Sequence, residues 1–141
     1  MLSSALLSVF TTTAQTIDPG DAIVFDQTRL LLDAGDFEVL GTGEIVINEA
    51  GVYELSYGYQ TATAGTFAAA FTPDGGIPAP LPGTTYLSLV SDQDLNTFVT
   101  LFVVPDGGGT LFIGNAGLAP HVIGPADTPT VTAFLNLVKV R

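Results

Sequence analysis

The chain has 141 residues, about the length of one domain, and we expect residues 1–141 to fold as a single domain. Its 14 acidic residues against 3 basic ones give a formal net charge of -11 at pH 7, which excludes a nucleic-acid surface built on clustered Lys and Arg. Cysteine is absent, which excludes thiol catalysis, and only 12% of residues are charged, so we expect another subunit or a ligand to cover part of the apolar surface.

The opening segment MLSSALLSVF looks superficially like a secretory leader, but it has no basic start and serines interrupt its apolar run. We therefore expect it to begin the first strand. No stretch reaches the roughly 18 apolar residues of a membrane span, so we expect none. The sequence leaves open whether the chain is a fragment of a longer protein.

Short runs rich in Val, Ile, Leu, Phe, Thr and Tyr follow one another, with 16 Gly and 9 Pro as punctuation between them. The predicted strands are residues 4–13, 22–25, 30–32, 37–40, 44–47, 52–61, 66–71, 86–91, 97–104, 110–114 and 130–140. Many short strands at regular spacing, without a helical period, predict an all-β sandwich or barrel.

The stretch 43–59 shows the clearest alternation. One face carries Tyr53, Leu55, Tyr57 and Tyr59, and the other carries Glu54, Ser56 and Gly58. A period of two is typical of a pleated strand with one buried face. The aromatic face is therefore expected in the interior, and the less apolar face is left for another partner.

Two later strands are apolar on both faces. In residues 97–104, Phe98, Phe102 and Val104 oppose Val99, Leu101 and Val103; in residues 130–140, Val131, Ala133, Leu135 and Leu137 oppose Phe134 and Val138. One face of each strand fills the sandwich. The opposite face needs its own cover, and a neighbouring subunit is the simplest one in an antiparallel sheet without helices.

The order of these landmarks resembles the jelly rolls of tumour necrosis factor (TNF) and complement globular heads. It resembles in particular the C-terminal domain of the collagen-like glycoproteins of bacterial spore surfaces, the BclA family. The segments that carry the resemblance are residues 16–25, residues 45–57, residues 97–101 leading into the Asp106-Gly107 turn, and residues 130–137. Together they span nearly the whole chain.

This resemblance implies a two-sheet antiparallel jelly roll of about ten strands that assembles as a homotrimer, with a collagen-like stalk entering at the gathered N-termini. By strand parity the residues expected at the trimer interface are Glu54, Ser56, Thr97, Val99, Leu101 and Val131. Those expected in the sandwich are Tyr53, Leu55, Phe98, Phe102 and Phe134.

Catalytic groups are sparse. A triad or dyad requires a histidine beside an activated nucleophile, and His121, the one histidine of the sequence, has no nucleophile motif nearby. We expect it at the surface or packed in a loop. The carboxylate pairs Asp33/Asp36 and Asp92/Asp94 fall in loops, where solvation is favoured over a glycosidase role. We therefore expect no catalytic residue and no enzyme.

Calcium is a weak candidate ligand. Asp92, Asp94 and Asn96 match the first three ligand positions of an EF-hand loop. Thr97 stands where that loop requires Gly, and Val103 where it requires Glu, so a true EF-hand is excluded. A calcium site made of loop carboxylates stays open, and no other cofactor is expected.

Two functions remain from different classes. The first is a non-enzymatic homotrimerising head of a collagen-like bacterial surface protein, extracellular or on the spore exosporium. The second is a head that binds a receptor, host protein or glycan through its exposed loops, residues 75–84 and 114–129. The two roles do not exclude each other.

Overall fold

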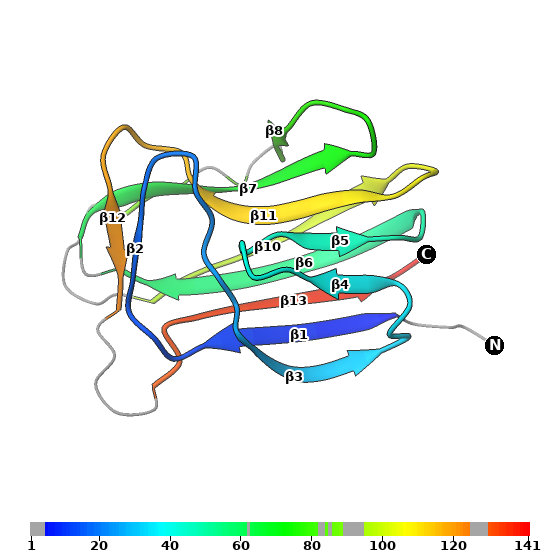
Figure 1. The fold of residues 1–141 in the computed structure, drawn as a ribbon, viewed down its shortest axis with the longest axis horizontal. Helices are drawn as coiled ribbons and strands as arrows, with labels where there is room; N and C mark the ends of the chain where they lie inside the picture. Colours follow the sequence, from blue (N-terminus) through cyan, green and yellow to red (C-terminus); the bar gives the residue numbers. More distant parts are fainter. Residues whose placement is uncertain (1–4, 62, 82–83, 85, 89–94, 125–129) are drawn as a thin grey trace.

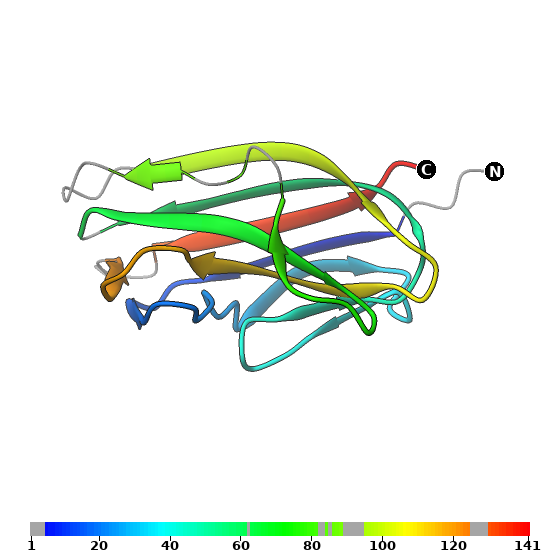
Figure 2. The ribbon, with the colours of Figure 1, turned by 90° about the horizontal axis from the view of Figure 1, so that it is seen from above.

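A computed structural model describes residues 5–61, 63–81, 84, 86–88, 95–124 and 130–141. Within these ranges every regular element is a β-strand, and the strands form two layers packed face to face (Figures 1 and 2). The all-β, antiparallel sandwich expected from the sequence is thereby confirmed. None of the described residues belongs to a helix that could cross a membrane.

One layer is a five-stranded antiparallel sheet in the order β10-β6-β13-β1-β3. Its strands are β1 (Leu6–Thr11), β3 (Gln27–Leu32), β6 (Gly51–Gln60), β10 (Leu95–Val104) and β13 (Ala133–Lys139). The strands β10 and β3 form its two edges. The sequence-distant β1 and β13 lie side by side, with Leu6 opposite Val138 and Thr11 opposite Ala133.

The other layer is a six-stranded sheet in the order β4-β5-β11-β7-β8, with β9 also paired to β7. Its strands are β4 (Phe37–Val39), β5 (Ile45–Ile47), β7 (Gly65–Pro73), β8 (Ala79–Pro80), β9 (Tyr86–Ser88) and β11 (Gly109–Asn115). A small pair, β2 (Gln15–Ile17) and β12 (His121–Ile123), crosses one end of the sandwich (Figure 1). The strands β2, β8 and β12 are additions to the predicted set, and each is two or three residues long.

The core lies between the two layers and is rich in aromatic rings. The alternation of β6 is confirmed, because Tyr53, Leu55, Tyr57 and Tyr59 are all at most 1% exposed. The Tyr59 ring lies 4.8 Å from the Phe67 ring of β7, centroid to centroid, and so ties the two sheets together. Each such fully buried side chain contributes roughly 1.5–3 kcal/mol to folding.

The alternation of β10 is confirmed as well. Phe102 and Val104 are buried, whereas Val99, Leu101 and Val103 are exposed. The strand is therefore apolar on both faces, and only one of them is used by the core.

Residues 22–25 do not form the strand that their composition predicts. The segment makes a single bridge, from Ala22 to Gly114. The Gln15 side chain takes the place of a neighbouring strand: its Nε2 donates to the Val24 carbonyl at 2.8 Å, and its Oε1 accepts from the Val24 N–H at 2.9 Å. The two backbone groups that a ladder would use are thus satisfied by a side-chain amide.

Phe134 does not lie in the sandwich, and this prediction was wrong. Its neighbours Ala133 and Leu135 are the buried residues of β13, so the alternation turns Phe134 outward. It lies opposite Gly58 of β6, where a Cβ atom would stand 2.5 Å from Phe134 Cε1. Glycine at position 58 therefore makes room for the ring on the outer side of the sheet.

Asp36 also departs from the prediction that the loop carboxylates are solvated. It is 3% exposed. One of its oxygens accepts from the Tyr53 hydroxyl at 2.9 Å and the other from the Glu49 N–H at 2.8 Å. A buried carboxylate is tolerated here because both oxygens receive donors.

Candidate functional site

The outer face of the five-stranded sheet is the side turned away from the six-stranded sheet. From β10 across to β3, the register aligns Thr97, Gly58, Phe134, Phe10 and Gln27 in one row, Val99, Ser56, Asn136, Ser8 and Leu30 in the next, and Leu101, Glu54, Val138, Leu6 and Leu32 in a third. Side chains in one row point the same way, so these residues share one surface.

This outer face carries two apolar flanks. The first, the β10 flank, consists of Val99, Leu101 and Val103, which are 69%, 61% and 67% exposed. The second, the β3 flank, consists of Leu30 and Leu32, which are 45% and 48% exposed. Within the described ranges no other element covers either flank, and large side chains grouped on one face of a sheet mark an interaction surface.

A narrow polar band separates the two flanks. Asn136 Nδ2 donates to Ser56 Oγ at 3.3 Å across β13 and β6. Ser8 continues the same row on β1 and is 7% exposed. The band is small and largely self-satisfied, so it does not prevent another protein surface from closing over the face.

Glu54 and Arg29 are charged residues of the outer face. Glu54 is exposed and lies in the row between Leu101 and Val138. Arg29 belongs to β3, where the register with β1 shifts, and its guanidinium carbon lies 5.1 Å from the centre of the Phe10 ring. This cation–π contact holds the arginine over the outer face.

The structure brings five of the six residues predicted for a trimer interface onto this one face: Glu54, Ser56, Thr97, Val99 and Leu101. Val131 precedes β13 and is half-buried, outside the rows formed by the strands. Sequence reasoning missed the β3 flank. The run Leu30-Leu31-Leu32 is apolar at every position, so it carries no alternation that could reveal a face.

His121 begins β12 and is 9% exposed, packed in the end of the sandwich and not at the surface. Its ring lies 5.9 Å from that of Phe67, centroid to centroid, and so close to Gly65 that a Cβ atom there would clash with it. Its Nδ1 has no hydrogen-bond partner among the described residues. The described contacts of the ring, with Phe67, Gly65 and Gly117, supply neither a nucleophile nor an orienting carboxylate.

Two tyrosines of the core have raised pKa values. Burial raises the pKa of Tyr59 to about 12, and its hydroxyl has no partner in the described part of the chain. Burial, together with the hydrogen bond to Asp36, raises the pKa of Tyr53 well above its usual range. Both groups therefore stay neutral in the folded chain at ordinary pH and act as structural parts of the core.

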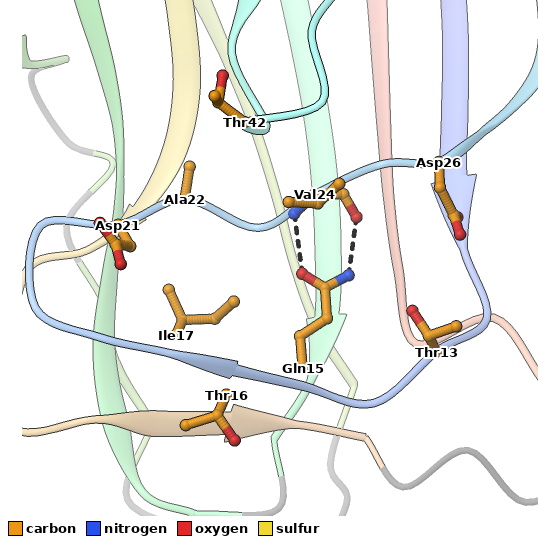
Figure 3. Close-up of a pocket in the computed structure, with 9 residues that line it drawn as sticks. All are labelled: Thr13, Gln15, Thr16, Ile17, Asp21, Ala22, Val24, Asp26 and Thr42. Atoms are coloured by element: carbon orange, nitrogen blue, oxygen red, sulfur yellow. Dashed lines mark hydrogen bonds between the residues drawn. The ribbon is translucent and has the colours of Figure 1, made fainter.

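An open hollow of about 630 Å³ lies at the end of the sandwich, between β2 and the segment 21–26 (Figure 3). It is lined by Thr13, Gln15, Thr16, Ile17, Asp21, Ala22, Val24, Asp26 and Thr42. Asp21 and Asp26 lie at opposite ends of the view, and the Gln15 amide bridges to Val24 between them. The lining mixes hydroxyl, amide and carboxylate oxygens with a few aliphatic side chains.

The calcium candidates are only partly within the described residues. Asp92 and Asp94 lie outside them, and Asn96 belongs to β10. In the part of the chain that is described, no three His, Asp or Glu side chains gather as a metal site would require. The calcium site stays a prediction.

Several solved structures have a fold similar to that of this chain. The globular domain of zebrafish complement 1qA has a TM-score of 0.72 at 14% identity, over 97% of this chain and 98% of that one. Murine APRIL at pH 5.0 has a TM-score of 0.70 at 14% identity, over 98% and 100%. The Eiger TNF of S. frugiperda has a TM-score of 0.60 at 15% identity, over 98% and 92%.

The likeness extends over almost the whole chain, but the identities are too low to show more than the fold. Neither the comparison with protein-family models nor that with curated proteins finds a match. The chain therefore has the jelly-roll fold of the complement C1q and TNF heads.

Proposed function

We propose that the chain is a non-enzymatic head domain that assembles as a homotrimer through the outer face of its five-stranded sheet. The observation that carries this proposal is the pair of apolar flanks on that face, with three side chains of the β10 flank more than 60% exposed. The jelly-roll fold agrees with the resemblance to TNF and complement heads, and that resemblance implies a homotrimer.

The size of the face fits such an interface. Five strands about 4.8 Å apart and about seven residues long span roughly 24 Å in each direction. A stable interface buries about 800 Å² per partner, which is near one ninth of the 7097 Å² surface of the chain. The face and the edge strand β10 together can supply an area of that order.

The arrangement of the flanks fits a ring of identical contacts. The β10 flank and the β3 flank lie at opposite edges of one sheet and differ in their side chains. When one flank of a subunit meets the other flank of the next, the contact is heterologous, and three copies close it into a ring. A two-fold dimer with its axis across the strands would place each flank against a copy of itself, whereas one with its axis along the strands would also pair the two different flanks, so the mass in solution distinguishes it from the ring.

The test is the mass in solution by light scattering. With 14.5 kDa per chain, a trimer has about 43 kDa, and we expect this mass to persist on dilution. A protein that runs as a folded monomer at all concentrations would refute the proposal.

The biological setting that we propose is the outer surface of a bacterium or spore, where the head would cap a collagen-like stalk. The resemblance to the spore-surface family supports this setting. In addition, the first described residues and the end of β13 lie at the same end of the sandwich, where a stalk could join all three subunits (Figure 1). Gly-X-Y repeats upstream in the full gene product would support the stalk, and a different upstream domain would contradict it.

A ligand-binding head is a second candidate, favoured by the open hollow beside β2. Its volume of about 630 Å³ falls within the usual range of small-molecule sites. Its hydroxyl, amide and carboxylate groups suit a polar, polyhydroxylated ligand such as a glycan. Binding of glycans that Thr16→Ala and Asp21→Asn abolish would support this role, and binding that survives both changes would place the ligand elsewhere.

A further inference from the structure

We infer that Glu54 of one subunit forms an ion pair with Arg29 of the next subunit, across the trimer interface. This inference rests on the proposed trimer and deepens it, because it states which flank meets which. It begins from the two opposite charges on the outer face, Glu54 beside the β10 flank and Arg29 on β3.

The two residues do not pair within one subunit. The strands β6 and β3 are separated by β13 and β1, so their backbones are about 14 Å apart at the usual strand spacing. Along the strands, Glu54 shares a row with Leu32, whereas Arg29 lies at the register shift next to Leu30. The guanidinium is moreover held over Phe10.

Closing the interface makes a partner for Glu54 necessary. Its row neighbours Leu101, Val138, Leu6 and Leu32 are all aliphatic. A neighbouring subunit that covers these side chains also removes water from the carboxylate between them. A carboxylate buried without a partner is costly, so buried charges are paired.

The chain offers few cations for this role, since its Lys and Arg total 3. Lys139 Nζ lies 2.8 Å from Glu49 Oε2, and this carboxylate raises the pKa of Lys139, so that cation is already paired. Arg141 is the last residue and lies beyond β13, where its N–H and that of Val140 both bond to the Val52 carbonyl, so it stands at the end of the sheet and not within the rows of the outer face. Arg29 is the cation that a contact with Phe10 holds on the outer face.

The ion pair also explains how strongly acidic subunits can assemble with the β10 flank of one subunit against the β3 flank of the next. A charge of -11 on each subunit opposes association. Glu54 of one subunit and Arg29 of the next give a local attraction, which contacts that bring Glu54 to Glu54 or Arg29 to Arg29 lack. The ion pair would therefore select the head-to-tail order that closes a ring.

The test is a charge swap followed by a dilution series. We expect Glu54→Arg and Arg29→Glu each to raise the concentration at which the trimer dissociates by about tenfold or more. The double variant, with both changes, is expected to restore most of the loss. The control is Glu38→Arg, an exposed glutamate of β4 in the six-stranded sheet, which changes the net charge as much as Glu54→Arg does and should leave dissociation unchanged.

A crosslinking experiment gives a second readout that does not need the ion pair. Because the chain has no cysteine, the double variant Glu54→Cys/Arg29→Cys can be treated with a short bismaleimide. We expect more covalent dimers and trimers from this variant than from either single variant, since each single variant lacks one of the two thiols that the inferred contact brings together.

The outcomes separate the inference from the proposed trimer. A wild-type monomer refutes the trimer, and the ion pair with it. If the wild type is a trimer, three results would refute the ion pair and leave the trimer standing. Glu54→Arg could dissociate like Glu38→Arg, or the cysteine pair could yield monomers only. The third is a charge-swapped double variant that is folded by circular dichroism but assembles no better than the worse single variant.

Discussion

Leu101→Ala should weaken the trimer strongly while leaving the fold of each subunit intact. Leu101 is 61% exposed in the isolated chain, so about three fifths of its side chain is left for a neighbour to cover. The substitution removes three carbon atoms at about 0.8 kcal/mol each. Scaled by the exposed fraction, the loss is about 1.5 kcal/mol per subunit, or about 4 to 5 kcal/mol for three subunits.

A loss of this size corresponds to about a thousandfold rise in the dissociation constant of the trimer. The assay is a dilution series followed by sedimentation velocity or mass photometry, with thermal unfolding of the monomer as a check on folding. The matched control is Leu118→Ala, the same change at a leucine that is 101% exposed in the turn before β12. If Leu101→Ala dissociates no more readily than Leu118→Ala, the reasoning from the β10 flank is refuted.

Three further predictions concern the folded subunit. Asp36→Ala should lower the free energy of unfolding by about 1 to 3 kcal/mol in urea titrations, because it leaves the Glu49 N–H without its acceptor and the buried Tyr53 hydroxyl with the Glu49 carbonyl as its remaining one; a change below 0.5 kcal/mol, the usual limit of a neutral surface substitution, would contradict this. Stability should fall as the pH rises from about 10 towards 12, because the pKa of Tyr59 is about 12 in the folded chain and 10.0 when unperturbed, so the unfolded chain loses its proton first. Tyr59→Phe should make this fall shallower, and an unchanged slope would show that Tyr59 does not cause it. Gly58→Ala should destabilise the subunit, since its Cβ would stand 2.5 Å from Phe134 Cε1 and 2.9 Å from the Asn96 carbonyl oxygen; a rise in melting temperature would contradict this contact.

The parts of the fold that the sequence predicts are those with local alternation. From Tyr53 to Tyr59 an apolar residue recurs at every second position, and the structure buries the face that carries these residues. The two-faced β10 was predicted for the same reason. The exposure of Val99 and Leu101 then follows directly, because a strand in one layer of a two-layer sandwich turns only one face to the core.

What the sequence did not predict depends on partners far along the chain. The Gln15 amide that satisfies Val24, and the Tyr53 hydroxyl that reaches Asp36, are contacts between separate segments that leave no periodic signal. Phe134 was misplaced because both faces of its strand are apolar, and a one-residue change of parity exchanges them. Only the register that places Phe134 opposite Gly58 decides between the two faces.

The most direct test of the central claim is whether the outer face touches another copy in solution. In a mixture of isotope-labelled and unlabelled subunits, filtered methyl NOEs report only contacts between subunits. We expect such NOEs at the methyl groups of Val99, Leu101 and Val103, and none at Leu118. An assembled particle that shows intersubunit NOEs elsewhere but none at the methyl groups of the β10 flank would contradict the account.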